Sequence, residues 1–390
     1  MLRIVPLIGV GFVFVSSAFA QMGAMPRPYM GLSGLIHTVR EEAFSCTGNP
    51  AEKPWRVNEV TYDRRGNETW RAFYNADGSV GHQVSSTFDA DGNETGWSAF
   101  NGKSETSPAG LHMHADFTLL NGKVISSVAY KEDTPVAKSI LDYDQRGNKI
   151  REVTVQIGCC TTTRAFKYDA KNRLIETTSD ANGLGYIQRL AYDANGNVIR
   201  DDRYEKGNLA WTTVRTFDGS RLVKEVITSS DGNIRTTLNT YNKAGNLYLT
   251  NIDDASITST TTIEYYDNGN IRSKDRVTVA KVGGGPQDSE ASPTPGRILE
   301  KYDIKGKQTE RYIYDAKGDL YSTQLSSYDD LGRQTRLIDT STLYPEYNRD
   351  LVYEHDTHGN QTAASCRNVT PTGEVKLFPS EKRTITYYDK

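Results

Sequence analysis

The chain has 390 residues, a net charge of −3 at pH 7 and a hydrophobic fraction of only 36%. A nearly balanced charge argues against a nucleic-acid partner, since nucleic-acid-binding proteins carry basic surfaces. Because hydrophobic residues are few, the 23 tyrosines must supply much of the buried surface.

The first 20 residues predict export. Arg3 precedes an apolar run over residues 4–15, and the small residues Ala18 and Ala20 follow it. This pattern is typical of a signal peptide, here cleaved after Ala20. The alternative, a membrane anchor, would need about 20 apolar residues, and the run is shorter. We therefore expect a secreted or periplasmic protein without an integral membrane span after cleavage.

Residues 21–55 contain no repeated motif, and we expect them to form a lead-in and a cap. From residue 56 to residue 390 one motif recurs, and these residues are predicted to form a single repeat domain. An aromatic residue is followed by Asp or Asn, and Gly comes three residues later. Clear copies occupy Tyr62–Asn67, Phe88–Asn93, Tyr143–Asn148, Tyr192–Asn197, Tyr241–Asn246, Tyr302–Lys307 and Tyr328–Arg333.

The aromatic residues act as regularly spaced anchors of the repeat. In the middle of the chain they are 24 or 25 residues apart, and weaker turn signals such as Asp231-Gly232 lie halfway between them. Each structural element is therefore one strand and one turn of about 12 residues. The predicted anchors are Tyr62, Phe88, Tyr143, Tyr168, Tyr192, Phe217, Tyr241, Tyr266, Tyr302, Tyr328, Tyr353 and Tyr388.

The motif also predicts the chemistry of its turn. Asp favours the first position of a type I turn because its carboxylate accepts backbone N–H groups two residues further on. Gly three residues later adopts the left-handed conformation that closes a hairpin with a bulge. Short strands at even spacing, such as 209–217 with its β-branched residues, predict an all-β protein of tandem hairpins.

The Tyr-Asp-x-x-Gly-Asn core resembles the YD repeat of the RHS family, which includes the shells of bacterial polymorphic toxins, insecticidal toxin cocoons and the teneurin shell. The resemblance covers about residues 62–390. It implies a long antiparallel sheet that curves or spirals like part of an RHS shell. Physical reasoning agrees, because sheets of more than about 10 strands must curl or split. The repeats run to Lys390, so we expect no toxin effector domain behind them.

Two segments interrupt the repeat. Residues 102–110 are expected to form a loop, and residues 282–296 are rich in Gly, Pro and Ser, which indicates a flexible insertion.

Cysteine and histidine residues are predicted to be structural. Four cysteines in an exported protein can form disulfides in three pairings, and the sequence does not choose among them. His112 with His114, and His355 with His358, form pairs that could hold a metal, but we favour no metal and no cofactor. The four candidate disulfide cysteines are Cys46, Cys159, Cys160 and Cys366.

The sequence carries none of the common catalytic motifs, so we predict that the protein is not an enzyme. The leading hypothesis is an exported scaffold that binds protein or carbohydrate through aromatic side chains such as Trp70, Trp97 and Trp211. One alternative is a structural shell of a toxin or secretion system that encloses a partner. A weaker alternative is an enzyme that acts on polysaccharide.

Overall fold

The structure is a computed structural model that describes residues 35–44, 53–102, 111–181, 183–281, 296–345, 348–369 and 373–388. The predicted signal peptide, Cys46, most of the predicted loop at 102–110 and all but the last residue of the insertion at 282–296 lie outside these residues. Among the described residues there is no helix long and apolar enough to cross a membrane.

The described residues are all-β, as the repeat predicted. The 26 strands are β1 (Ile36–Ala43), β2 (Arg56–Tyr62), β3 (Glu68–Tyr74), β4 (Val80–Phe88), β5 (Glu94–Asn101), β6 (Leu111–Leu120), β7 (Lys123–Lys131), β8 (Thr134–Tyr143), β9 (Lys149–Gln156), β10 (Cys160–Tyr168), β11 (Leu174–Ala181), β12 (Leu184–Tyr192), β13 (Val198–Glu205), β14 (Asn208–Asp218), β15 (Arg221–Ser229), β16 (Ile234–Tyr241), β17 (Leu247–Asp253), β18 (Ile257–Tyr265), β19 (Ile271–Ala280), β20 (Arg297–Tyr302), β21 (Gln308–Tyr314), β22 (Leu320–Tyr328), β23 (Gln334–Ser341), β24 (Arg349–His355), β25 (Gln361–Val369) and β26 (Val375–Tyr387).

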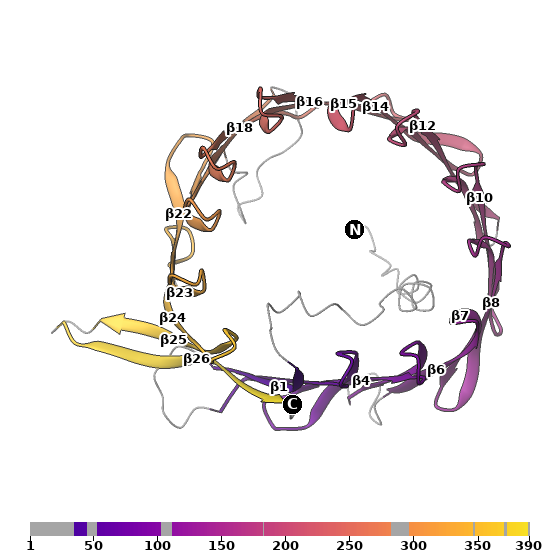
Figure 1. The fold of residues 1–390 in the computed structure, drawn as a ribbon, viewed down its shortest axis with the longest axis horizontal. Coiled ribbons are helices and arrows are strands. Elements are labelled where there is room, and N and C mark those ends of the chain that lie inside the picture. The colour runs from indigo at the N-terminus through magenta and orange to yellow at the C-terminus, as the bar shows by residue number, and fades with distance from the viewer. Residues whose placement is uncertain are drawn as a thin grey trace, which may run out of the picture. The chain divides into compact units, whose positions relative to one another are not determined.

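The strands pair antiparallel, mostly with their neighbours in the chain (Figure 1). The chain divides into two units. Unit 1 comprises residues 1–164, 354–364 and 379–390, and unit 2 comprises residues 165–353 and 365–378. Within unit 1, β1 pairs with β2 on one side and with β26 on the other. The segment 21–55, predicted to be a lead-in and cap, therefore holds a full strand of the sheet.

The hydrophobic core is small. In unit 1 it consists of Ile36, Val39, Val60 and Tyr62, with Ile385 and Tyr387 packed against them. Many of the other buried residues are small or polar; they include Ala72, Ala115, Ser127, Ser139 and Thr213. Because these strands bury few long aliphatic side chains, hydrogen bonds must supply a large share of the stability.

The turns have the chemistry that the motif predicts. In the turn after β12, the carboxylate of Asp193 accepts hydrogen bonds from the Asn197 backbone N–H (2.9 Å) and from its side-chain amide (2.8 Å). Gly196 has a φ of 91°, and its N–H donates to the Asp193 carbonyl. A register shift at Ala191/Tyr192 marks the bulge. The same carboxylate contacts recur in the turns that begin at Asp63, Asp89 and Asp144.

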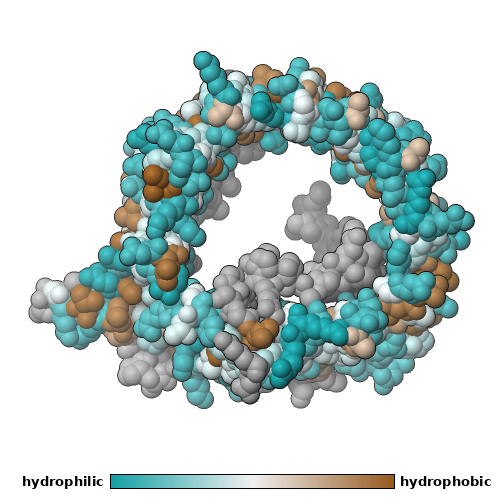
Figure 2. Space-filling model, viewed as in Figure 1, coloured by the Kyte–Doolittle hydropathy of each residue, from teal (hydrophilic) through white to brown (hydrophobic). Residues whose placement is uncertain are grey.

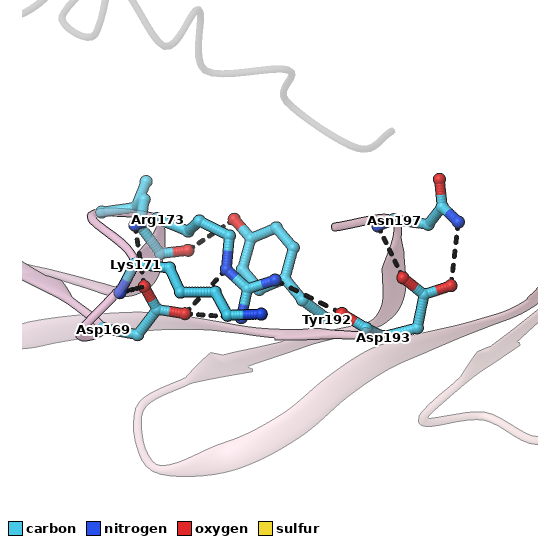
Figure 3. A network of polar contacts seen from close by, with 7 residues as sticks. Asp169, Lys171, Arg173, Tyr192, Asp193 and Asn197 are labelled. Atoms are coloured by element: carbon cyan, nitrogen blue, oxygen red, sulfur yellow. Dashed lines mark hydrogen bonds and ion pairs between the residues drawn. The ribbon is translucent and has the colours of Figure 1, made fainter. Parts of the chain in front are cut away.

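Side chains also link neighbouring turns, as Figure 3 shows for the turns after β10 and β12. Arg173 pairs with Asp169 within its own turn, lies 4.4 Å from the centre of the Tyr192 ring, and donates to the Asp193 carbonyl. Asn197 in turn donates to the Gly219 carbonyl at 2.8 Å. Adjacent hairpins are therefore joined at their turns as well as along their strands.

The anchor tyrosines join neighbouring hairpins through their hydroxyl groups. Six of them donate a hydrogen bond of 2.6–2.9 Å to a backbone carbonyl of the neighbouring hairpin: Tyr143 to Val124, Tyr192 to Leu174, Tyr241 to Leu222, Tyr266 to Tyr302, Tyr328 to Gln308, and Tyr388 to Tyr62. Among the other anchors, Tyr62 is buried in the core, Tyr302 donates to Glu300, Phe88 and Phe217 lie at bulges, and Tyr168 ends β10.

Two predicted anchors are displaced by one or two residues. The turn after β18 begins at Tyr266, which takes the Asp position, so Tyr265 is the anchor and donates to the Leu247 carbonyl. The turn after β24 begins at Asp356 and has the usual length, so His355 rather than Tyr353 stands in the aromatic position. Backbone hydrogen bonds, rather than the aromatic residue, define where each turn begins.

We predict that Gly196→Ala lowers the free energy of unfolding by about 1–2 kcal/mol, the cost of a left-handed conformation for a residue with Cβ. A Cβ at Gly196 would meet no atom within 4 Å, so the effect is purely conformational. Gly185 in β12 is the matched control, because its surroundings are equally open and its φ is not positive. Gly185→Ala should be neutral or slightly stabilising. If urea denaturation shows the same loss of unfolding free energy for Gly196→Ala and Gly185→Ala, this explanation is contradicted.

The turn carboxylates predict a specific response to acid. The hydrogen bond from the Asn197 side chain holds the pKa of Asp193 below its usual 3.8. The resulting stabilisation is fully present above pH 3.8 and is lost as the pH falls through the lowered pKa. In an NMR titration from about pH 5 to about pH 2, the Asn197 amide should therefore shift with a midpoint below 3.8.

The Asn246 amide is the internal control for this titration. It donates to the side-chain oxygen of Asn242, which has no carboxyl group to titrate. Parallel shifts of the Asn197 and Asn246 amides would show that the whole sheet responds to acid rather than the Asp193 carboxylate.

Candidate functional site

The clearest candidate site is an apolar groove of about 390 Å³ in unit 1, on one face of strands β5 to β10. Strand β6 contributes Leu111, Met113, Ala115 and Phe117, which alternate along the strand and so share a face. The other apolar lining residues are Trp97 on β5, Ala129 on β7, Ala137 and Val136 on β8, and Ile157 after β9. We call this site the apolar groove.

The register of the sheet explains why a hollow forms at this place. Trp97 pairs with Ala115, Ala115 with Ala129, Ala129 with Ala137, and Ala137 with Gln156. Residues that are directly opposite in antiparallel strands lie on the same face of the sheet. Three alanines therefore stand in a row across the strands between Trp97 and Gln156, and their short side chains leave the hollow.

A buried carboxylate lies in the wall of the apolar groove. Glu152 on β9 is 4% exposed, and it forms ion pairs with Lys149 at 3.1 Å and with Arg164 at 3.8 Å. Burial, with a smaller effect of the Glu152 charge, raises the pKa of the nearby Tyr143 hydroxyl. Because two cations face Glu152, this part of the groove is polar but not strongly negative.

The three tryptophans proposed as ligand-facing residues do not form one surface. Trp97 lines the apolar groove. Trp70 pairs with Ser85, Ser85 with Ser98, and Ser98 with His114, so Trp70 lies on the opposite face from Trp97. Trp211 belongs to unit 2, where its ring lies 5.0 Å from the Arg203 guanidinium.

The histidine pairs contact polar and aromatic neighbours. His112 hydrogen bonds Ser98 at 2.9 Å, and His114 stacks on Tyr130. His358 stacks on Tyr387, whose hydroxyl hydrogen bonds Asp356. In the part of the chain that the structure describes, no group of three or more His, Cys, Asp or Glu residues could hold a metal ion.

The three described cysteines are in two chemical states. Cys366 is disulfide-bonded. Cys159, in the turn between β9 and β10, and Cys160, the first residue of β10, are free thiols, and Cys159 is one of the residues that line the apolar groove. All four cysteines were predicted to be possible disulfide partners, and nothing in their spacing distinguishes Cys366 from the free thiols Cys159 and Cys160.

A second, polar pocket of about 680 Å³ lies on strands β18 to β21 of unit 2. Its charged groups pair with neighbouring side chains: Asp275 accepts two hydrogen bonds of 2.8 Å from Arg297, and Lys301 pairs with Glu310 at 2.6 Å. Burial, together with the Glu300 carboxylate, raises the pKa of the lining residue Tyr302 to about 12, so its hydroxyl stays protonated at neutral pH. These ion pairs leave less free polarity for a ligand than the lining residues suggest.

Comparisons with known proteins found resemblance only among solved structures, because no family model and no curated protein matches the sequence. The TcdB2-TccC3-TEV structure is 12% identical, with a TM-score of 0.42, and the match covers 87% of this chain and 21% of that chain. The Photorhabdus luminescens Tc holotoxin pore is 13% identical, with a TM-score of 0.36 and coverage of 88% and 21%. A porin-like protein from Bacteroides uniformis is 13% identical, with a TM-score of 0.21 and coverage of 64% and 95%.

This chain thus spans about a fifth of the length of the Tc toxin chains that it matches. Its structural neighbours include chains of the Tc toxin TcdB2-TccC3, at low sequence identity.

Proposed function

We propose that the protein is an exported, non-enzymatic repeat scaffold that binds a partner protein, and that the apolar groove holds an apolar segment of this partner. The groove carries the proposal, because it gathers apolar side chains of strands β5 to β8 in one hollow. Figure 2 shows hydrophilic residues over most of the visible surface and hydrophobic residues in small separate groups. Export rests on the first 20 residues of the sequence.

The composition of the apolar groove favours protein over carbohydrate. Sugars are held by many hydrogen bonds to hydroxyl groups, with an aromatic platform beneath the ring. Of the lining side chains, Leu111, Met113, Phe117, Val136 and Ile157 offer no hydrogen bonds, and the charged lining residues Glu152 and Arg164 already pair with each other. The remaining polar lining residues are Ser127, Lys131, Thr154, Gln156 and Thr162. Met and aromatic residues are enriched at protein interfaces, and Met adapts its shape to a partner side chain. A volume of about 390 Å³ suits a few apolar side chains.

We predict that Ile157→Asp weakens binding of the apolar dye anilinonaphthalene sulfonate at least tenfold, since it places a charge in the groove. Ile157 is 57% exposed, so the change should leave the fold intact. Val155, 41% exposed on the other face of β9, is the matched control, and Val155→Asp should leave dye binding unchanged. Ala129→Leu, which fills the hollow without adding charge, should also reduce binding. Equal dye binding by all three variants would show that the apolar groove is not the binding site.

Cross-linking from positions 157 and 155 identifies the class of partner. A photoreactive amino acid at position 157 should cross-link a protein in the exported fraction of the source cells, and the same group at position 155 should not. A glycan adduct at position 157, or equal protein adducts at both positions, would contradict a protein-binding groove.

A shell that encloses its partner is the second candidate function, and the pairing of β1 favours it. Val39 on β1 stands opposite Val60 on β2 and opposite Ile385 on β26, so neither side of β1 is a free edge. A sheet joined in this way is suited to surround another chain.

We expect that a shell would protect its partner from protease. The partner cross-linked at position 157 should then resist a protease that digests it when it is free, until the shell is unfolded. If the partner is digested at the same rate when it is free and when it is cross-linked, the protein acts as an open binding scaffold and not as a shell.

A further inference from the structure

The turn between β9 and β10 is fastened differently from the repeat turns. Its residues Ile157, Gly158 and Cys159, and Cys160 at the start of β10, include no Asp or Asn, so the carboxylate contacts of the repeat turns are missing. The Cys159 N–H donates to the Gln156 carbonyl at 3.1 Å, and the Cys160 thiol donates to the Gln156 side-chain oxygen at 3.0 Å. Thiols thus stand where turns such as the one after β12 have an acid and an amide.

The two thiols of this turn are close together and accessible. The Cys159 Sγ lies 2.6 Å from the Cys160 Sγ, and both cysteines are free. Cys159 is exposed at the edge of the apolar groove, and Cys160 is half-exposed. Gly158 has a φ of 79°, and a Cβ there would meet nothing within 4 Å, so the turn has room to adjust. A disulfide needs the sulfurs at about 2.0 Å, so a small movement would bring them together.

We propose that Cys159 and Cys160 form a reversible dithiol/disulfide couple, a redox modification site at the edge of the apolar groove. The oxidant is a small-molecule disulfide, the kind of reagent that an exported chain meets in an oxidising compartment. One cysteine thiolate attacks this disulfide and forms a mixed disulfide, and one equivalent of small thiol leaves. The second cysteine then displaces the other equivalent. Two S–H bonds of the protein are exchanged for one S–S bond, and the oxidant gains the two electrons and two protons.

Chain geometry makes this couple reversible rather than a permanent cross-link. Consecutive Cα atoms are about 3.8 Å apart, whereas disulfide-bonded cysteines usually have Cα atoms 4.4–6.8 Å apart. A disulfide between neighbours is therefore strained, and strained disulfides are reduced more easily than structural ones. The disulfide of Cys366 provides the structural comparison within the same chain. The couple does not depend on the groove having a partner.

The hydrogen bond with Cys160 raises the pKa of the Cys159 thiol, and this sets the pH dependence of closure. A raised pKa leaves less thiolate at neutral pH, and the thiolate is the attacking form. Formation of the Cys159–Cys160 disulfide should therefore become faster as the pH rises toward and above 9.0, the usual pKa of a thiol.

The couple can be tested on a single tryptic peptide of the full chain. Cleavage after Arg151 and Arg164 releases residues 152–164, which contain Cys159 and Cys160 and no other cysteine. The protein is equilibrated in buffers of increasing reduced-to-oxidised glutathione ratio. Its free thiols are alkylated with iodoacetamide, the chain is digested with trypsin, and the peptide masses are measured by mass spectrometry. In oxidised buffer we expect a peptide that lacks two hydrogens relative to the dithiol form, and in reduced buffer we expect a doubly alkylated peptide. The Cys366 disulfide should need at least about tenfold more reductant to open.

Single-thiol variants provide the control. Cys159→Ser and Cys160→Ser should each keep one glutathione on this peptide in oxidised buffer, because no second thiol can displace it. Both substitutions are at an accessible turn, and circular dichroism would verify the fold. Two alkylated thiols in every buffer, intermolecular dimers in place of the light peptide, or opening only together with the Cys366 disulfide would each overturn the proposal.

Discussion

The structure depends on the hydrogen bonds that an Asp side chain makes within its turn. In a sheet with so small a hydrophobic core, burial alone cannot specify where each strand ends. The carboxylate of Asp193 binds two N–H groups of Asn197, and the left-handed Gly196 lets the chain reverse there. Arg173 then joins its turn to the Asp193 turn, and Asn197 joins the Asp193 turn to the next one at Gly219. The repeated turn is thus both the end of one hairpin and the contact to the next.

Much of the fold was predictable because this turn chemistry is local. Asp and Gly at fixed spacing predict the turn without knowledge of the rest of the chain, and the structure confirms it at Asp63, Asp89, Asp144 and Asp193. The aromatic anchor was a weaker guide, since His355 and Tyr265 fill positions assigned to Tyr353 and Tyr266. The turn that begins at Asp315 was not predicted, although it has the same backbone hydrogen bonds and a Gly318 φ of 91°.

The apolar groove could not be predicted, because it arises from register rather than from a motif. Ala115, Ala129 and Ala137 belong to three different strands and are common residues in the sequence. They form a row only because each bulge sets the alignment of the next strand, and a slip of one residue would move a side chain to the other face. For the same reason, Trp97 could be chosen by residue type, whereas the position of Trp70 on the opposite face could not be foreseen.

The position of β1 between β2 and β26 has a consequence for how the chain reaches this structure. The hydroxyl of Tyr388 bonds the carbonyl of Tyr62, 326 residues away, and Thr38 bonds Thr386 across 348 residues. Contacts of such high sequence separation form late, because a long loop must close before they contribute any stability. During synthesis, one edge of β1 therefore stays unpaired until β26 has been made, and in that interval it is open to strands of other molecules.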